Sequence, residues 1–322
     1  MSKRIIVTGG AGFIGSNIVA ALNERGEENI LVVDELGGDE KWKNLTGLRY
    51  EEYQEKDDFR AAMQYERVTT DVEAVFHMGA CSSTTEKNAS FLTDNNYRYT
   101  RELCDWCLQH DVRFIYASSG ATYGDGSLGY SDSDEVTPTL RPLNMYGYSK
   151  QMFDLWALRH EALDRIAGLK YFNVYGPHED HKGDMRSVIH KAYGQIVETG
   201  EVKLFRSYRP DYRDGEQMRD FIYVKDAVAV TLFFYDHPAV SGLFNCGTGK
   251  ARTWNDLAKA VFGAMGKVAK VTYIDMPDYL REKYQYRTEA DVTKLREAGY
   301  NKPFTSLEDG VRDYVASYLV KK

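Results

Sequence analysis

Short, continuous hydrophobic runs alternate with amphipathic stretches along the first half of the chain. The four runs, each of strand length, are residues 4–8, 30–34, 73–77 and 112–118. Between them, apolar residues one helical turn apart predict helices over residues 13–25 and 95–110. Because strands buried on both faces are continuously apolar, this pattern predicts an α/β fold with a Rossmann-type, doubly wound parallel sheet.

The pattern changes beyond about residue 175, where short segments interleave charged and aromatic residues. The polar stretch 207–219 predicts a long loop, and helical patterns return at residues 254–263 and 306–319. This second part predicts a smaller α/β substrate-binding domain at the edge of the first. The expected division is a nucleotide-binding domain of residues 1–172, rejoined by about 220–247, and a substrate-binding domain of about 173–219 and 248–322.

Three glycines follow the first predicted strand and open the first predicted helix. Gly9 permits a tight turn, Gly12 lets the backbone approach a pyrophosphate, and Gly15 lets the helix pack on the strand. The helix N-terminus then offers free N–H groups and a partial positive charge to phosphates. Asp34, at the end of the second strand, completes the pattern, which predicts a bound dinucleotide.

The residues after the second strand bear on the choice between NAD and NADP. Asp34 alone would bond the adenosine ribose hydroxyls and select NAD. Lys41, Lys43 and Lys56 follow it, and a lysine near the 2′ position can hold the extra phosphate of NADP. We therefore expect NADP, with NAD as the alternative.

A tyrosine and a lysine four residues apart predict the reaction centre. Tyr146 and Lys150 share one face of a predicted helix, and a nearby ammonium is expected to lower the pKa of the phenol. Tyr146 would then move a proton on or off an alcohol during hydride transfer. Ser119, at the carboxyl end of the fourth strand, would hydrogen-bond the same oxygen.

Charge and composition exclude several partners. The net charge of −7 over 322 residues argues against nucleic acid or an anionic membrane as the main partner. No apolar run approaches the roughly 20 residues that a membrane helix needs, and the N-terminus carries no cleavable apolar segment. A cytoplasmic location is expected.

Two motifs suggest metal or redox chemistry but have simpler interpretations. Cys104 and Cys107 form a CxxC inside a predicted helix, without a partner pair, and are interpreted as core residues. His178, His181 and His190 lack carboxylates at convincing ligand spacing. No metal site is expected.

Several longer motifs resemble the extended short-chain dehydrogenase/reductase family, and within it the ADP-heptose 6-epimerases that supply lipopolysaccharide inner-core synthesis. The motifs are residues 77–86, 94–97, 117–124, 172–177, 181–183 and 219–224. The most specific are Gly79-Ala80-Cys81-Ser82-Ser83-Thr84-Thr85-Glu86 and His181-Lys182-Gly183. The resemblance implies retained NADP, an ADP-linked heptose as substrate, and a homo-oligomer, expected to be a pentamer.

The resemblance also implies site residues by matching motif. The implied cofactor contacts are Phe13, Ile14, Asp34, Glu35, Lys41, Lys56, Met78, Gly79, Ala80, Cys81, Ser82, Asn95, Lys150, Val174 and Lys182. The implied substrate contacts are Asn173, Asp184, Lys191, Phe205, Arg206, Ser207, Tyr208, Arg219 and Tyr284. Glu35 and Asp184 depart from the family pattern, which more often has Asn and a small hydroxyl residue there.

Epimerisation at carbon 6 explains why two acid/base groups, Tyr146 and Lys182, are implied. Carbon 6 lies outside the sugar ring, so rotation about one bond presents its other face to the nicotinamide. The oxygen then points away from Tyr146, and a second proton-transfer group is needed. The alternatives are a UDP- or GDP-sugar 4-epimerase, which would not need Lys182, and a redox-sensing binding protein without turnover. A 4,6-dehydratase is disfavoured by Gly120-Ala121, where those enzymes have an Asp-Glu pair.

Overall fold

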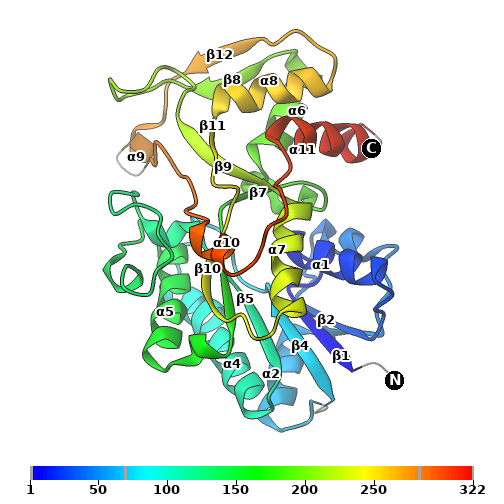
Figure 1. Ribbon diagram of the computed structural model, residues 1–322. Helices are drawn as coiled ribbons and strands as arrows, with labels where there is room; N and C mark the ends of the chain where they lie inside the picture. Colours follow the sequence, from blue (N-terminus) through cyan, green and yellow to red (C-terminus); the bar gives the residue numbers. More distant parts are fainter. Residues whose placement is uncertain (1–2, 69–70, 282–283, 321–322) are drawn as a thin grey trace.

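A seven-stranded parallel sheet forms the centre of the molecule in a computed structural model that describes residues 3–68, 71–281 and 284–320 (Figure 1). In spatial order the strands are β10 (Gly242–Cys246), β6 (Ala167–Tyr171), β5 (Arg113–Ser119), β4 (Val72–His77), β1 (Arg4–Thr8), β2 (Ile30–Asp34) and β3 (Glu52–Glu55). The predicted doubly wound sheet is confirmed. The strand order reverses between β1 and β4, and such a switch point opens a crevice for ligands at the carboxyl ends of the strands.

Helices cover both faces of this sheet, as Figure 1 shows. One face carries α1 (Phe13–Glu24) and α7 (Val224–Asp236), and the other carries α2 (Lys56–Gln64), α4 (Tyr99–Gln109) and α5 (Met145–Arg159). Alternate residues of β1 serve the two layers: Ile5 and Val7 pack with α1 and α7, whereas Ile6 packs with α4 and α5. Burial on both faces is why the inner strands β1, β2 and β4 are continuously or nearly continuously apolar.

The helix predicted over residues 95–110 begins earlier and is irregular. It starts as α3 (Ala89–Leu92), passes through a π-helical turn, η2 (Thr93–Arg98), and continues as α4. Asn96 lies within this turn and is fully buried. Single π-helical turns of this kind are frequent at functional sites. Cys104 and Cys107 are buried on α4, as core residues.

The second region lies at the carboxyl edge of the large sheet. Its strands are β7 (Asn173–Tyr175), β9 (Met218–Tyr223) and β11 (Ala251–Thr253), which form one sheet, and β8 (Val202–Phe205) and β12 (Val271–Ile274), which form another. Its helices are α6 (Val188–Thr199), α8 (Trp254–Ala264), α9 (Asp278–Arg281), α11 (Leu307–Tyr314) and the π-helical η7 (Val315–Leu319). The short helix α10 (Thr293–Glu297) returns to the central sheet, where Lys294 Nζ donates to the Leu243 carbonyl oxygen of β10 at 3.0 Å. Short 3-10 helices are η1 (Glu40–Leu45), η3 (Gly120–Tyr123), η4 (Thr137–Thr139), η5 (Ala162–Asp164) and η6 (Asp180–Met185).

The long loop predicted over residues 207–219 ends two residues early. Met218 and Arg219 already belong to β9, because the Met218 amide donates to the Tyr286 carbonyl at 2.8 Å and the strand pairs with β11. None of the helices in the described ranges is long and apolar enough to cross a membrane.

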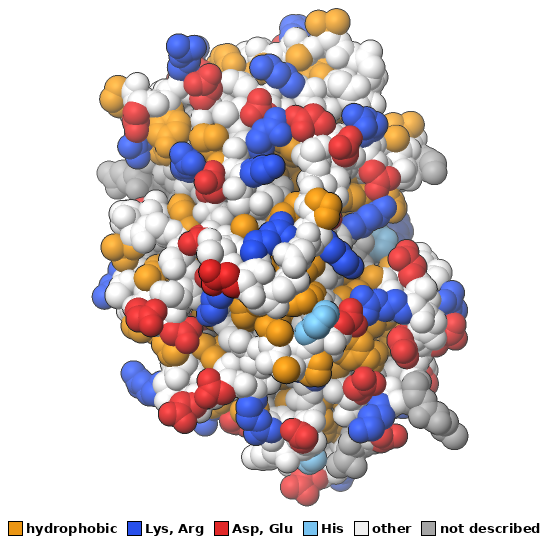
Figure 2. Space-filling view, viewed as in Figure 1, with side chains coloured by type: hydrophobic (Ala, Val, Ile, Leu, Met, Phe, Trp, Pro, Cys, Tyr) orange, Lys and Arg blue, Asp and Glu red, His pale blue; other side chains and the backbone are white. Residues whose placement is uncertain are grey.

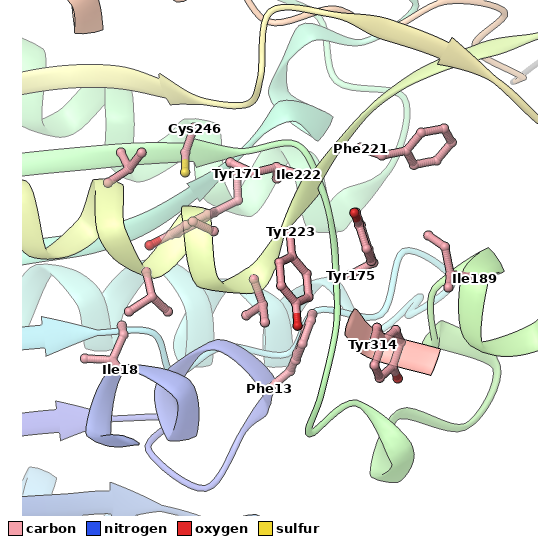
Figure 3. Packing of buried hydrophobic residues seen from close by; sticks show 14 of the residues in the cluster. Phe13, Ile18, Tyr171, Tyr175, Ile189, Phe221, Ile222, Tyr223, Cys246 and Tyr314 are labelled. Atoms are coloured by element: carbon pink, nitrogen blue, oxygen red, sulfur yellow. The ribbon is translucent and has the colours of Figure 1, made fainter. Parts of the chain in front are cut away.

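Aromatic packing joins the two regions around the start of α1. Figure 3 shows Phe13 of α1 in one buried cluster with Tyr175, Tyr223 and Tyr314 of the second region. The Tyr175 and Tyr223 rings lie 5.4 Å apart, and Tyr314 of α11 is buried in the same cluster. The glycine loop and the second region therefore share one core.

Candidate active site

One large cavity lies between the carboxyl edge of the central sheet and the second region. Its volume is about 1530 Å³, which exceeds the range of about 300–1,000 Å³ for a site holding one small molecule. The predicted site residues that line it are Gly9, Gly12, Phe13, Ile14, Gly15, Asp34, Lys41, Met78, Gly79, Ala80, Cys81, Ser82, Ser119, Tyr146, Lys150, Asn173, Val174, Lys182, Arg219 and Tyr284. The cavity has room for a dinucleotide and a second ligand together.

The glycine loop is built for close approach of a ligand to the backbone. Gly9 has a φ of +65°, and a Cβ on Gly15 would lie 2.1 Å from the Gly9 carbonyl oxygen. The α1 N-cap, Gly12, has no side chain to occupy the free N–H groups of the helix. The loop therefore fits a pyrophosphate at the helix N-terminus.

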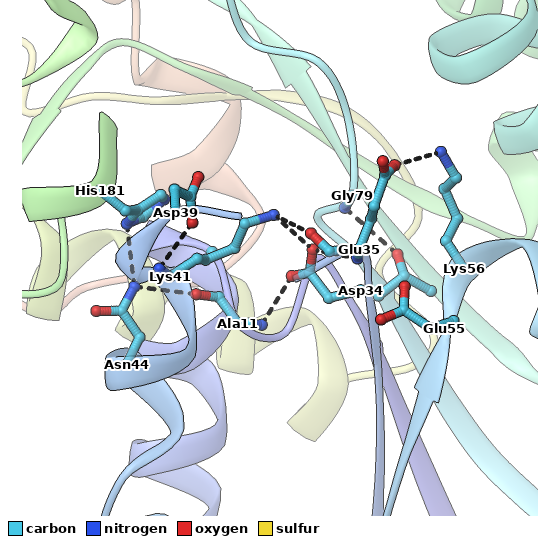
Figure 4. Close-up of polar contacts among 12 residues, drawn as sticks. Ala11, Asp34, Glu35, Asp39, Lys41, Asn44, Glu55, Lys56, Gly79 and His181 are labelled. Atoms are coloured by element: carbon cyan, nitrogen blue, oxygen red, sulfur yellow. Dashed lines mark hydrogen bonds and ion pairs between the residues drawn. The ribbon is translucent and has the colours of Figure 1, made fainter. Parts of the chain in front are cut away.

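Asp34 anchors a polar cluster at the far side of this loop (Figure 4). Its Oδ2 accepts from the Ala11 amide at 2.8 Å, and its Oδ1 accepts from Lys41 Nζ at 2.9 Å. Lys41 also donates to the Glu35 carbonyl oxygen at 2.7 Å. Lys41 is thus held beside Asp34 at the edge of the cavity, where an adenosine ribose would lie.

Three other predicted cofactor contacts meet outside the cavity wall. Lys56 Nζ lies 2.9 Å from Glu35 Oε2 and 3.1 Å from Asn95 Oδ1, and none of the three residues lines the cavity. The hydrogen bond from Lys56 lowers the pKa of Glu35, so this acid stays charged and paired. Lys43 pairs with Glu40 instead of facing the cavity.

Buried polar side chains hold the segment Met78–Ser82, which follows β4, in place. Asn96 Nδ2 donates to the Cys81 carbonyl oxygen and Asn96 Oδ1 accepts from the Cys81 amide, both at 2.9 Å. The His77 ring bonds the Thr8 hydroxyl at 2.6 Å and the Thr100 hydroxyl at 2.9 Å. Burial, with a smaller effect of Lys150, lowers the pKa of His77 to about 3, so the ring is neutral.

Tyr146 and Lys150 lie in the first turns of α5, whose N-cap Asn144 accepts from the Gly147 amide at 2.8 Å. Burial raises the pKa of Tyr146, and its hydrogen bond with Ser119 opposes this rise. Lys150 Nζ donates to the Ala117 carbonyl oxygen at 2.7 Å, and burial lowers the pKa of Lys150 to about 8. The expected lowering of the Tyr146 pKa by Lys150 is therefore wrong: burial raises the pKa of this phenol, and the group that opposes the rise is Ser119.

Lys182 enters the cavity from η6, on a different element from Tyr146. Its Nζ lies 5.0 Å from the centre of the Phe13 ring. Burial lowers the pKa of Lys182, and the nearby Glu179 carboxylate opposes the shift. A partly desolvated lysine of this kind can exchange a proton more readily than an exposed one.

The end of the cavity away from the glycine loop holds a buried guanidinium between aromatic rings. Arg219 is only 8% exposed, and its Cζ lies 5.5 Å from the Trp254 ring and 5.1 Å from the Tyr284 ring. Burial lowers the pKa of Arg219. Within the described parts of the chain, no carboxylate forms an ion pair with it. A buried cation without a counter-ion suits an anionic ligand.

The other predicted substrate contacts do not line the cavity. Lys191 is exposed and donates to the Asp184 carbonyl oxygen at 2.6 Å, on the outer side of η6. The segment Phe205–Tyr208 lies behind the cavity wall, with the Phe205 ring 6.4 Å from that of Tyr284. These six residues, namely Asp184, Lys191, Phe205, Arg206, Ser207 and Tyr208, are therefore not brought to the site in this structure, because their side chains turn to solvent or to neighbours.

Sequence reasoning missed part of the wall. The additional lining residues include Asp39, Ser83, Thr84, Thr85, Glu86, Lys87, Asn144, Arg186, Trp254, Gln285 and Thr288. Two signals could have marked the run Ser83–Lys87: it directly follows the segment Met78–Ser82, and residues 83–86 belong to the motif of residues 79–86 noted in the sequence. Gln285 and Thr288 lie in an irregular segment without a pattern that could have marked them.

The three histidines considered for a metal have other partners. His178 Nδ1 lies 2.9 Å from Ser16 Oγ, His181 Nδ1 lies 3.1 Å from Asn44 Nδ2, and His190 Nε2 lies 3.0 Å from Asp180 Oδ1. Residues 3–68, 71–281 and 284–320 contain no group of three metal-binding side chains.

Figure 2 shows positive and negative side chains interspersed over one face of the molecule.

Comparison with known proteins gives consistent similarities. A model of the NAD dependent epimerase/dehydratase family matches residues 5–247. The ADP-L-glycero-D-manno-heptose-6-epimerase of Nitratidesulfovibrio vulgaris (strain DP4) is 61% identical over 314 residues, covering 98% of this chain and 97% of that protein. The crystal structure of the Helicobacter pylori ADP-L-glycero-D-manno-heptose-6-epimerase has a TM-score of 0.80 at 28% identity, covering 98% of this chain and 96% of the other. The Thermus thermophilus UDP-glucose 4-epimerase, in complex with NAD, has a TM-score of 0.75 at 27% identity, covering 97% of each chain.

Proposed function

Since this chain belongs to the NAD-dependent epimerase/dehydratase family, we propose that it inverts carbon 6 of an ADP-linked heptose. The substrate would be ADP-D-glycero-D-manno-heptose and the product its L-glycero epimer, a precursor of the lipopolysaccharide inner core. The name of the 61% identical relative supports this choice. The observation that carries the proposal is that Tyr146 and Lys182 line one cavity from two different elements.

Each residue of the site has a part in this reaction. When bound, NADP supplies reversible hydride transfer at carbon 6. The phenolate form of Tyr146 would accept the proton of the carbon-6 hydroxyl as the hydride leaves carbon 6, and Ser119 would hydrogen-bond the same oxygen. After carbon 6 rotates, the Lys182 ammonium would donate its own proton to the oxygen as the hydride returns to carbon 6, and proton exchange with water would restore both groups. Lys150, one helical turn from Tyr146 on α5, supplies a positive charge in its protonated form, which is the main form below pH 8 because burial lowers its pKa to about 8.

The remaining residues of the cavity would bind the two nucleotides. Gly9, Gly12 and the start of α1 receive the pyrophosphate of NADP, and Lys41 its 2′-phosphate. The buried Arg219 neutralises the diphosphate of the sugar nucleotide. We also propose a homo-oligomer, expected to be a pentamer, which sedimentation equilibrium of the purified protein can measure.

The direct test is turnover of the two candidate substrate classes. Purified protein is incubated separately with ADP-D-glycero-D-manno-heptose and with UDP-glucose, and the products are identified by proton NMR. We expect the carbon-6 epimer from the ADP-heptose and no UDP-galactose. Formation of UDP-galactose at the higher rate would replace the proposal with a UDP-sugar 4-epimerase, the activity named for the Thermus neighbour.

A further inference from the structure

Three side chains of α5, spaced four residues apart, contact the end of β5. Tyr146 bonds Ser119, and Lys150 Nζ donates to the Ala117 carbonyl oxygen at 2.7 Å. The third is Asp154, one turn beyond Lys150. Because residues four apart share a helix face, one stripe of α5 contacts consecutive residues of one strand.

Asp154 uses both carboxylate oxygens on β5. Its Oδ2 accepts from Ser118 Oγ at 2.6 Å, and its Oδ1 accepts from the Tyr116 hydroxyl at 2.9 Å. Asp154 is 0% exposed, and Ser118 and Tyr116 are 2% and 1% exposed. These bonds fix the strand on either side of Ala117 and directly before Ser119.

A buried lysine of the next strand completes this network. Lys170 of β6 is 0% exposed. Its Nζ lies 3.8 Å from Asp154 Oδ2 and 3.1 Å from Thr122 Oγ1, which belongs to the turn after β5. Well-packed apolar residues are often at least as stable as a buried ion pair. The charged pair of Asp154 and Lys170 is therefore better explained by a role in the neighbouring active site than by a contribution to the stability of the fold.

We propose that Asp154 is a positioning residue for the reaction, which fixes the Ser119 end of β5 and presents a negative charge to the Lys150 ammonium. This inference rests on the proposed function for the reaction itself. It extends the Tyr146–Lys150 pair by one helical turn. Asp154 does not line the cavity and acts only through the groups that do.

The charge of Asp154 has a measurable consequence for Lys150. No carboxylate in the described residues forms an ion pair with Lys150, which is 4% exposed. Burial lowers the pKa of Lys150, while Asp154 on α5 and Cys81 on the segment Met78–Ser82 raise it. The neutral His77 of β4 is the other titratable group electrostatically coupled to Lys150. Loss of the Asp154 charge should therefore let Lys150 lose its proton at lower pH.

The experiment uses the intact protein with two readouts. The first is NADP binding followed by fluorescence between pH 6 and 10, which requires no turnover. The second is epimerisation of the ADP-heptose over the same range. In Asp154→Asn, we expect the pH above which NADP binding weakens to fall by about one unit. Turnover at pH 8 should fall by about 10-fold or more. The pH above which the turnover rate declines should also move to a lower value.

A double variant separates positioning from ion pairing. Asp154→Asn alone leaves Lys170 buried without a counter-charge, so it is expected to lower the thermal unfolding midpoint. Asp154→Asn/Lys170→Met removes that charge and should regain stability while keeping the shifted binding profile. Ser118→Ala keeps all the charges, so it should slow turnover without shifting the pH dependence of NADP binding.

Two results would overturn the inference. One is an Asp154→Asn protein whose NADP-binding profile matches the wild type. The other is a double variant that recovers both the wild-type profile and the wild-type rate, because Asp154 would then serve only Lys170. If the wild-type protein does not epimerise the ADP-heptose, the proposed function fails, and the binding profiles still decide the charge effect of Asp154.

Discussion

The ammonium nitrogen of Lys182 lies 5.0 Å from the centre of the Phe13 ring. This contact joins η6 to the first residue of α1, so the second proposed acid/base group is held against the glycine loop. A cation over an aromatic face gains about 0.5–2 kcal/mol, more when it is desolvated. Lys182 is therefore oriented by the nucleotide-binding region as well as by its own loop.

Tyr146→Phe and Lys182→Met should each depress epimerisation strongly. Each variant removes one proton-transfer group while keeping most of its volume, so a loss on the order of 100-fold is expected. Neither variant should abolish NADP binding, although Lys182→Met loses its contact with Phe13. Initial rates and NADP titrations are the measurements.

The roles of these two groups can be separated with a hexose analogue that has an aldehyde at carbon 6. Its disproportionation into acid and alcohol needs hydride transfer but no change of face. One of the two variants should retain this activity after losing epimerisation. A Lys182→Met protein that epimerises at the wild-type rate would leave Tyr146 as the only base and disprove the two-base proposal.

Lys41→Ala should reduce the affinity for NADP by about 1–3 kcal/mol, the range for losing a charge-assisted hydrogen bond. Affinity for NAD should change much less, because NAD has no 2′-phosphate. Lys43→Ala is the matched control, since Lys43 pairs with Glu40 outside the cavity. Equal losses for the two nucleotides in Lys41→Ala, or NAD alone released on denaturing the purified protein, would contradict the NADP assignment.

Arg219→Gln should remove most of the thermal protection that ADP gives. A ligand that binds only the native state raises the unfolding midpoint, and Arg219 is a buried cation that lines the cavity and lacks an ion pair in the described residues. Differential scanning fluorimetry with ADP and UDP at equal concentration is the measurement. Wild-type protein should be protected more by ADP, and stronger protection by UDP would favour the 4-epimerase.

Acid should destabilise the fold through His77 before the carboxylates titrate. The pKa of His77 is lowered to about 3 in the native state, whereas an unfolded histidine titrates at about 6.5. Above the unfolded value both states are neutral. As pH falls below it, the unfolded state binds the proton first, and stability is lost progressively towards pH 3. Between pH 7 and 5 the loss from His77 alone is about 2 kcal/mol.

Urea unfolding of wild type and His77→Gln at both pH values tests this acid sensitivity. The variant should be less stable at pH 7, because the ring bonds Thr8 and Thr100. Its stability should then fall less than that of the wild type on going to pH 5. Parallel losses in the two proteins would show that other groups cause the acid sensitivity.

Four strands of the central sheet, β1, β2, β4 and β5, could be predicted because burial on both faces leaves a continuous apolar signal. β6 and β10 could not be, because Lys170 and Asn245 interrupt their short apolar runs although both strands are buried. β3 could not, since its sequence Glu52-Tyr53-Gln54-Glu55 is polar and it is an edge strand with neighbours on one side only. The π-helical turn η2 could not be predicted either, because no local pattern marks it and its buried Asn96 is bonded to Cys81 on a distant segment.

The site shows the same division between local and tertiary signals. The glycine loop, Ser119, Tyr146 and Lys150 are set by strand ends and helix starts, and all line the cavity. The segment Phe205–Tyr208 belongs to a strand end and a loop whose side-chain directions depend on distant contacts. The raised pKa of Tyr146 depends on burial, which the spacing of two residues does not reveal.

One of the two edge strands of the central sheet, β10, comes late in the chain. β10 pairs with β6, yet the chain first builds α6, β8 and β9 before it returns to the sheet. During synthesis, the glycine loop and the segment Met78–Ser82 are therefore already made while β6 still presents an unpaired edge. Such an edge invites pairing with other chains. A fragment that stops before Gly242 should accordingly aggregate rather than fold as an autonomous nucleotide-binding unit.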